Sequence, residues 1–458
     1  MAAGVVLRRW LPTAQEVPLP RSRPRRRLYT ALVVTAASAI TVALASSTGA
    51  ASAAAPSTAY RANDYANGQA MSILPPGENG LVNGSDLLKY EALGIRPPNS
   101  QDQLAQYTNL IYGASSLTDS TLSTYYNDES FGVRPQDVVR TEAPETGVTI
   151  YRDTKDIPHV YGNNDADLAF GAGYAQAEDR LFLMDVLRHY GEGSLAGFLG
   201  ASCDFEQMDH DQLLLSAYTH KQAVAQVDAL PAEYGAQGQL AKTMIYNYVD
   251  GVNAYIKKAL SNVKYLPADY VAAVPEILPV KWNVGDVVAI AGLIGGIFGR
   301  GGGSEVANAM LLKYLQQELG TTDGRRAYDD FKRSNDPLAP TTSDVNFPYE
   351  TPGTVDPATT AMPDSSTLTG GPPATDPNCN LQKPNVEALG IIASLESLPK
   401  HMSNALVVNA DKSADGHPIA VFGPQVSYFA PQILSQLDLH SPDYDAEGAS
   451  FPGTGIVE

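Results

Sequence analysis

The chain has 458 residues, 44% of them hydrophobic, with 31 Lys and Arg against 50 Asp and Glu. Residues 1–27 hold seven Arg and one Glu and residues 28–53 hold no charge, so the remainder carries 24 minus 49, or −25. Such an acidic body repels phosphate backbones and anionic lipid, which argues against nucleic-acid and membrane-surface binding and favours a small neutral or cationic substrate. The apolar content is ample for a core, and the charge content is too low for a disordered chain.

The amino end predicts export. An uncharged apolar run from Leu28 to about Ala45 is followed by an A-x-A-like cleavage site at residues 51–53. Five arginines precede the run: Arg21, Arg23, Arg25, Arg26 and Arg27. We therefore interpret residues 1–53 as a signal peptide of the Sec or twin-arginine type and expect a secreted protein. An uncleaved membrane anchor is the alternative, since the run could span a thin bilayer.

The chain contains two cysteines, Cys203 and Cys379. In an oxidising compartment they could pair, and closing so long a loop would stabilise the fold by about 4 kcal/mol or more. Two free buried thiols are the alternative.

Residues 54–146 form a polar amino-terminal extension with a short predicted helix at 85–93 and no recognisable chemistry. An alternating strand at 148–153, a turn at 154–156 and a second extended segment at 157–161 then predict a β-hairpin. A long helix follows, capped by Asn164 or Asp165 and ending near Gly191, because apolar residues recur at helical spacing.

Further helices are predicted at 240–260, 286–297 and 304–319, so the region 147–348 is mostly helical. Composition changes after residue 348, where a mixture of Pro, Thr, Ser, Gly and Asp predicts a linker, followed by a short helical piece at 386–398. A strand then begins at Ser403 and runs to Val408, with a turn at 414–416 and a second strand near 419–422.

The sequence lacks complete motifs for a phosphate-binding loop, a zinc site or an α/β-hydrolase. The glycines at 299–303 resemble a phosphate-binding loop, but no Lys-Ser/Thr pair follows and a helix precedes them. The seven histidines lack metal-ligand spacing, and His159 is better explained as a hydrogen-bonded structural residue than as a catalytic one. No G-x-S-x-G elbow supports an α/β-hydrolase such as a lipase.

Ser403 remains as a candidate nucleophile. If the bond between Met402 and Ser403 were cut, the new α-amino group would lie on the same residue as the hydroxyl. With a reference pKa of about 7.7–8.0, that amine could accept the hydroxyl proton, so one residue would supply nucleophile and base. On position alone, a surface serine at the start of a strand is the preferred explanation.

Two blocks in a fixed order resemble the penicillin acylase family of N-terminal-nucleophile hydrolases. The first comprises residues 148–153, 157–160 and 171–185 (the last reading GAGYAQAEDRLFLMD), and the second comprises residues 403–408 and 423–425. The resemblance implies an α+β fold, the αββα sandwich, present here in incomplete form. It also implies a small-subunit region at 147–348, a spacer at 349–402 and the start of the large subunit at 403–458.

The resemblance also implies residue roles. Ser403 matches the nucleophile that self-cleavage frees, and Glu305 matches a carboxylate that binds structural calcium; its alternative is an ordinary acidic residue in the first turn of a helix. Gln425, Phe298 and Arg300 match positions that shape the acyl-binding pocket.

The implied activity is hydrolysis of linear amides, such as N-acyl β-lactams or N-acyl homoserine lactones, through an acyl-enzyme, by a self-processed pair of subunits that binds no nucleic acid and, after signal cleavage, no membrane. In the family, the large subunit continues beyond the point matched by Glu458 and carries the oxyanion-hole asparagine, its orienting arginine and most calcium ligands. An inactive fragment or a secreted non-enzymatic remnant is therefore the alternative, and the strands after Ser403 are expected to keep open apolar faces and edges.

Overall fold

The computed structural model describes residues 70–72, 82–97, 109–110, 112–272, 277–298, 305–332, 403–414, 416–424 and 433–457. The predicted signal peptide and the whole of the predicted spacer, with its helical piece at 386–398, lie outside these ranges. No helix in the described ranges is both long and apolar enough to cross a membrane.

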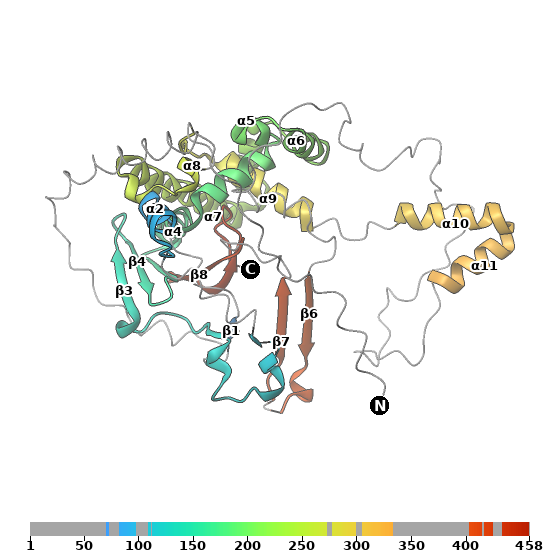
Figure 1. Cartoon of the computed structure of the whole chain (residues 1–458), viewed down its shortest axis with the longest axis horizontal. Coiled ribbons are helices and arrows are strands. Elements are labelled where there is room, and N and C mark those ends of the chain that lie inside the picture. The colour runs from blue at the N-terminus through green and yellow to red at the C-terminus, as the bar shows by residue number, and fades with distance from the viewer. Residues whose placement is uncertain are drawn as a thin grey trace. The chain divides into compact units, whose positions relative to one another are not determined.

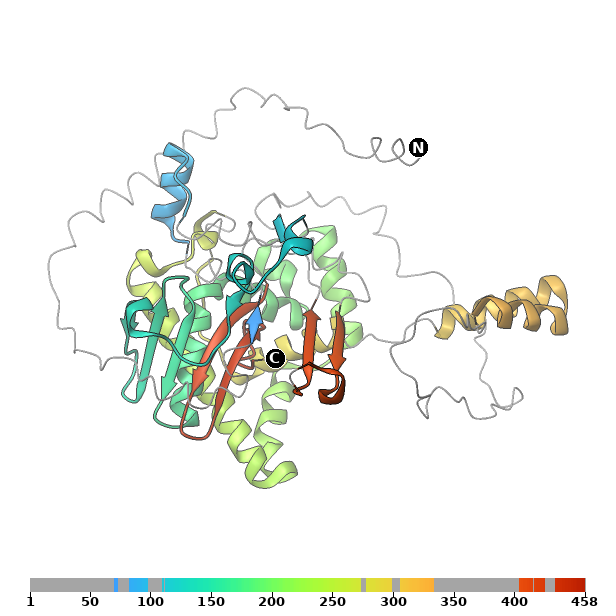
Figure 2. The same cartoon turned by 90° about the horizontal axis from the view of Figure 1, so that it is seen from below.

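A five-stranded sheet forms one layer of the described chain, with the strand order β3-β4-β5-β8-β9 (Figure 2). Its strands are β3 (Val138–Glu142), β4 (Val148–Asp153), β5 (Pro158–Gly162), β8 (Ser435–His440) and β9 (Asp445–Ser450). β4 and β5 form the predicted antiparallel hairpin, and β5 pairs in parallel with β8. The sheet therefore joins chain segments from both sides of Ser403.

The expectation of open strands after Ser403 is wrong for β8, whereas β9 is an edge strand of the sheet. Leu437 and Leu439 of β8 are buried in the main hydrophobic core, because β8 lies between β5 and β9 and faces the helices. The expectation holds for the separate hairpin of β6 (Ser403–Val408) and β7 (Ile419–Pro424), where Leu406 is 55% exposed and Val421 is 61% exposed.

One face of the five-stranded sheet is covered by helices, with α4 (Asp165–Gly191) at the centre (Figure 1). The Asn164 side chain caps α4 by accepting a hydrogen bond from the Asp167 amide, as predicted. α7 (His220–Ser261) and α9 (Val284–Phe298) pack against α4, so α4 is buried on nearly all sides. This helical layer and the sheet confirm the predicted α+β class.

α4 and α7 cross closely because glycines face the opposing backbone. A Cβ atom on Gly173 of α4 would lie 2.0 Å from the Tyr248 carbonyl oxygen, and one on Gly251 of α7 would lie 1.9 Å from the Phe170 carbonyl oxygen. No side chain fits in either place, so the two helix backbones are in direct contact.

One helix of this layer, α7, differs from the prediction, and further elements complete the described structure. α7 begins 20 residues earlier than the predicted 240–260 helix and bends at Gly235, whose φ is 60°. The other helices are α2 (Gly84–Leu93), α5 (Leu195–Leu199), α6 (Cys203–Leu215), α8 (Asp269–Ala272), α10 (Glu305–Leu319) and α11 (Thr321–Lys332). Two short strands, β1 (Met71–Ser72) and β2 (Asn127–Asp128), pair with each other. Cys203 is disulfide-bonded, and Cys379 lies outside the described residues.

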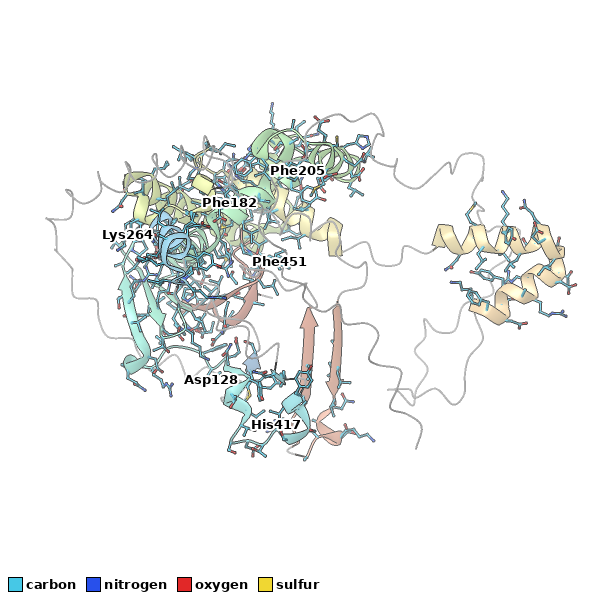
Figure 3. All side chains as sticks on the ribbon, in the orientation of Figure 1. Asp128, Phe182, Phe205, Lys264, His417 and Phe451 are labelled. Carbon is cyan, nitrogen blue, oxygen red and sulfur yellow. The ribbon has the colours of Figure 1, made fainter. Side chains whose placement is uncertain are left out.

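The second face of the five-stranded sheet is polar, and residues 127–137 lie against it; we call them the cover segment. The strand pairing puts His159 and Asp438 on this face, opposite the residues that face α4. Val133 of the cover segment packs with Tyr151 and Tyr161 in a small second apolar cluster. In Figure 3, Asp128 of this segment lies on the side of the sheet away from Phe182 of α4.

Candidate functional site

Ser403 is the first residue of β6, as the sequence predicts. In the antiparallel register it pairs with Pro424, the last residue of β7, so Gln425 follows directly after the residue opposite Ser403. The backbone therefore brings Ser403 and Pro424 to the same end of the hairpin. The side chain of Ser403 and the whole of Gln425 lie outside the described residues.

Local sequence accounts for this hairpin. β6 (SNALVV) and β7 (IAVFGP) are rich in apolar residues that favour strands, and the intervening 3-10 helix (Ala410–Lys412) and Gly416, with φ 75°, turn the chain back. Pro424 has no amide hydrogen and closes β7, which is where a strand tolerates proline. The hairpin is thus a short, locally specified support for Ser403.

The other predicted site residues lie in or beside the segment 299–304. Phe298 is the last residue of α9, and Glu305 is the first residue of α10, while Arg300 lies outside the described residues. The positions of the Phe298 and Glu305 side chains also lie outside what the structure describes. No described contact brings these residues to Ser403, so their proposed roles stay predictions.

Calcium needs about six to eight oxygen ligands. Glu305 is the single calcium ligand that the resemblance assigns in this chain, and one carboxylate supplies at most two oxygens. The Glu305 side chain lies outside what the structure describes, so a calcium site at this position stays a prediction.

In the described part of the chain, one group of side chains could hold a metal ion: Glu192, His220 and Asp286. Its atoms already have partners. His220 Nδ1 lies 2.7 Å from Glu192 Oε1, and Asp286 Oδ1 accepts a hydrogen bond from Arg188 at 3.1 Å. These contacts explain the group without an ion.

The E-D-R sequence at 178–180 forms a buried ionic network that sequence analysis did not find. Arg152 of β4 is fully buried and donates to Asp179 at 2.7 Å and to Glu178 at 3.0 Å. Arg140 of β3 donates to both Glu178 oxygens at 2.9 and 3.1 Å. Two strands are thereby fixed to α4. Charged residues inside an otherwise apolar helix were the sequence signal for this network.

The electrostatics of the network differ between its two carboxylates. Burial alone would raise the pKa of Glu178, but Arg152 and Arg140 outweigh it and lower the pKa to about 2. For Asp179, burial is the larger effect and raises the pKa to about 8 despite Arg152. The local backbone is also irregular, since Arg180 departs from helical geometry with φ −140° and ψ 21°.

A second buried network attaches α4 to the loop before α9. Asp185 accepts hydrogen bonds from Tyr270 at 2.5 Å, from the Trp282 indole at 2.9 Å and from Arg188 at 2.7 Å. Arg188 also donates to Asp286 at 3.1 Å. Asp185 is fully buried, and its three donors compensate its carboxylate. Through Arg188, which also binds Asp286, the network fixes α9 against α4.

The polar face of the sheet holds a third network around Asp438. His159 Nδ1 lies 2.6 Å from Asp438 Oδ2, and His440 Nε2 lies 2.7 Å from Asp438 Oδ1. The Gly132 amide donates to Asp438 Oδ2 at 3.0 Å. His159 is therefore a hydrogen-bonded structural residue, as predicted, although nothing in the sequence indicated that its partner would lie 279 residues away.

Burial and charge act against each other in this third network. Burial would lower the pKa of His159, but hydrogen bonds to Asp153 and Asp438 outweigh it and raise the pKa to about 9. Burial would raise the pKa of Asp438, and the two histidines instead lower it to about 2. Burial raises the pKa of Glu129 to about 7. The centre is thus an ionised Asp438 carboxylate that holds the pKa of both His159 and His440 above the ordinary histidine value.

A half-open cavity of about 110 Å³ lies beside this network, with His159, Lys155 and Glu447 among its lining residues. Its walls carry both signs of charge. Carboxylates come from Asp128, Asp137, Asp153 and Glu447, and cations come from Arg134, Lys155 and His159. This balance favours neither an anion nor a cation, and the cavity is not assigned a ligand.

Comparison with known proteins identifies relatives that are named as acylases. The family model described as penicillin amidase matches residues 147–458. Penicillin G acylase of Escherichia coli is 29% identical over 343 residues, which cover 69% of this chain and 38% of that protein. Penicillin acylase 2 proenzyme of Pseudomonas sp. (strain SE83) is 31% identical over 154 residues, or 33% of this chain and 17% of that protein. Acyl-homoserine lactone acylase QuiP of Pseudomonas fluorescens (strain Pf0-1) is 23% identical over 314 residues, or 68% and 32%.

Among solved structures, thermostable penicillin G acylase from Alcaligenes faecalis aligns with 27% identity and a TM-score of 0.37, covering 45% of this chain and 100% of that chain. We draw nothing about the fold from a TM-score this low. The chain spans 38% or less of the length of each curated relative named above. The family match nevertheless extends from residue 147 to residue 458, more than half of the sequence, and the chain therefore belongs to the penicillin amidase family.

Proposed function

We propose that this chain supplies the nucleophile of a secreted amidohydrolase that is made as a precursor and cleaves itself before Ser403. The observation that carries the proposal is the position of Ser403: it opens β6, directly after the predicted spacer and within the region that the family model matches. A relative whose name includes "proenzyme" supports a processed precursor.

In this mechanism, scission of the bond after Met402 frees the Ser403 amine. The amine takes the hydroxyl proton, directly or through one water, while the Ser403 oxygen attacks the substrate carbonyl. The carbon–nitrogen bond breaks, the amine product leaves with the proton that the Ser403 amine held, and the acyl group stays on the Ser403 oxygen. Water then attacks the ester and releases the carboxylic acid, which regenerates the hydroxyl.

The substrate class is a linear N-acyl amine. The relatives are named for penicillin and for acyl-homoserine lactones, so N-acyl β-lactams and N-acyl homoserine lactones are the first substrates to test. In the proposal Gln425, Phe298 and Arg300 shape the acyl site and Glu305 contributes to calcium binding. The chain spans 38% or less of the length of these relatives, so its activity on such substrates is a proposal made by comparison with the longer relatives.

Mass spectrometry of the expressed protein tests the cleavage. A new amino terminus at Ser403 is expected, and Ser403→Ala should remain uncut. Ser413→Ala, a serine change at the end of the turn in the same hairpin, is the matched control and should be cut normally. A Ser403→Ala protein that is still cut after Met402, or that still hydrolyses acyl amines, would overturn the assignment.

A further inference from the structure

The cover segment contacts residues from both sides of Ser403. His159 and Tyr161 of β5 precede Ser403 in the chain, whereas Asp438 and His440 of β8 follow it. All four lie on the polar face of the sheet, where the parallel register pairs 159 with 438 and 161 with 440. The cover segment lies over the seam between these two strands.

Asp438 is the centre of this contact. It accepts from the Gly132 amide of the cover segment at 3.0 Å and from His159 of β5 at 2.6 Å, and it forms an ion pair with His440 of β8 at 2.7 Å. Asp438 is completely buried, so loss of any of these partners leaves a buried charge less compensated.

Other contacts of the cover segment divide between the two sides. Toward β8, Gln436 donates to Glu129 at 2.6 Å, and the Phe131 ring meets the His440 ring with centroids 5.8 Å apart. Toward β4 and β5, Val133 packs on Tyr151 and Tyr161. Toward the β4–β5 turn, Lys155 donates to Asn127 at 2.5 Å. Glu129 and Val133 are 7% and 4% exposed, so this surface is packed and not a loose overlay.

A cut before Ser403 changes how β8 is held to β5. In the uncut chain, β8 is tethered to β5 and is present at a high effective concentration. After the cut, β8 and β9 belong to a separate polypeptide, and noncovalent contacts alone oppose its dissociation. The β5–β8 ladder is one such contact, and the cover segment adds contacts to both strands at once.

We propose that the cover segment is a clasp that holds the segment after Ser403 to the segment before it once the chain is cut, so that the amino-terminal extension stays in the mature protein. The inference rests on the proposed function for its biological role. The clasp itself can be tested without self-cleavage.

The test uses the full chain with Ser403→Ala and a recognition sequence for a specific protease placed between residues 380 and 402. This position lies after Cys379, so the disulfide of Cys203 does not join the two fragments. After cleavage by the added protease, retention of the downstream fragment is measured by size-exclusion chromatography over a dilution series. The clasp variant carries Glu129→Ala, Phe131→Ala and Val133→Ala. The matched control carries Leu93→Ala and Ile95→Ala, which lie in the same extension and are 70% and 53% exposed.

In the cut protein, the clasp variant should release the fragment at a concentration about tenfold higher than the parent does, an effect comparable to the loss of one or two buried hydrogen bonds. The control should match the parent. Equal retention in the clasp variant and the control would overturn the proposal. Because the cut is made by an added protease, this result is independent of whether Ser403 cleaves the chain.

A measurement on the unmodified chain keeps the test valid if the triple variant does not fold. Hydrogen exchange at the Gly132 amide, which donates to Asp438, should be as slow as exchange in β8. Exchange as fast as in the exposed 3-10 helix Ala114–Ser116 would contradict the clasp. In a self-processed preparation, the upstream fragment that copurifies with the downstream fragment should still contain residues 127–137. An upstream fragment that lacks them would overturn the proposal.

Discussion

Buried charges dominate this protein at the scale of single residues. Arg152, Asp185 and Asp438 are each fully buried, and each is surrounded by partners of opposite charge or by hydrogen-bond donors. Such pairs add little net stability relative to apolar residues, but removal of one member leaves an uncompensated charge in the core. The family-like motifs at 148–153 and 171–185 thus contain a structural ion pair between β4 and α4.

Replacing Arg152 by Met should lower the free energy of unfolding by about 3–5 kcal/mol, because Glu178 and Asp179 lose a buried guanidinium. Urea unfolding followed by circular dichroism measures the change. Arg134→Met is the control, since Arg134 pairs with Asp137 at the surface with its side chain 59% exposed, and a loss below about 1 kcal/mol is expected. Similar losses in the two variants would argue against the network.

His159 makes stability depend on pH. Its pKa is raised from 6.5 to about 9 by Asp153 and Asp438 against the effect of burial, so its stabilising contribution is fully present below pH 6.5 and is lost as the pH rises through 9. His159→Gln should therefore cost more at a pH below 6.5 than at a pH above 9, by up to about 3 kcal/mol. Urea midpoints of parent and variant at both pH values measure this, and a cost independent of pH would contradict it.

At the scale of elements, the crossing of α4 and α7 organises the helical layer. The two helices approach through glycines, and α4 contacts α9 and the sheet as well. Local sequence determines the length and start of α4, but the contact depends on which residues face each other across the crossing. A glycine inside a helix costs up to about 1 kcal/mol in helix propensity, which the close packing here has to offset.

Gly251→Ala should be destabilising by about 1–3 kcal/mol or more, because the new Cβ would lie 1.9 Å from the Phe170 carbonyl oxygen and the helices would have to separate. Gly197→Ala in α5 is the matched control, since nothing lies within 4 Å of a Cβ there. The control should be neutral or slightly stabilising in thermal unfolding. A neutral Gly251→Ala would mean that the crossing is looser than described.

At the scale of the whole molecule, segments on both sides of Ser403 share one sheet and one core. β8 lies between β5 and β9, and Ile433, Leu434 and Phe451 are part of the main apolar cluster. The chain is therefore not a small-subunit region followed by an independent strand segment. A cut before Ser403 would leave two polypeptides that remain interleaved.

The disulfide of Cys203 also links distant parts of the chain. The chain has two cysteines and Cys203 is not free, so thiol titration of denatured, unreduced protein should find no free group. Reduction should lower the thermal midpoint, with a contribution of up to about 4–5 kcal/mol for a long loop. Cys203→Ser should be insensitive to reductant. Two titratable thiols in the parent would remove the disulfide.

The sequence by itself determined much of the local structure. Helical periodicity and an Asn cap predicted α4, and alternation predicted β4. Turn residues between extended segments predicted β5 and the β6–β7 hairpin, and the resemblance of two ordered blocks predicted the family and Ser403 as its candidate nucleophile. These features depend on residues close together in the chain, so short-range patterns contain them. The amino-terminal half of α7 and the whole of α6 were not predicted, since their apolar spacing is weaker and Pro231 and Gly235 interrupt the pattern.

Only the tertiary structure decided how distant segments meet. The parallel pairing of β5 with β8, the partners of Arg152 and Asp438 and the position of the cover segment join residues up to 307 positions apart. A buried charge can be compensated by any of several opposite charges in the sequence, and a strand can pair with any compatible edge. Burial and packing select one partner among these, and that choice depends on the whole fold.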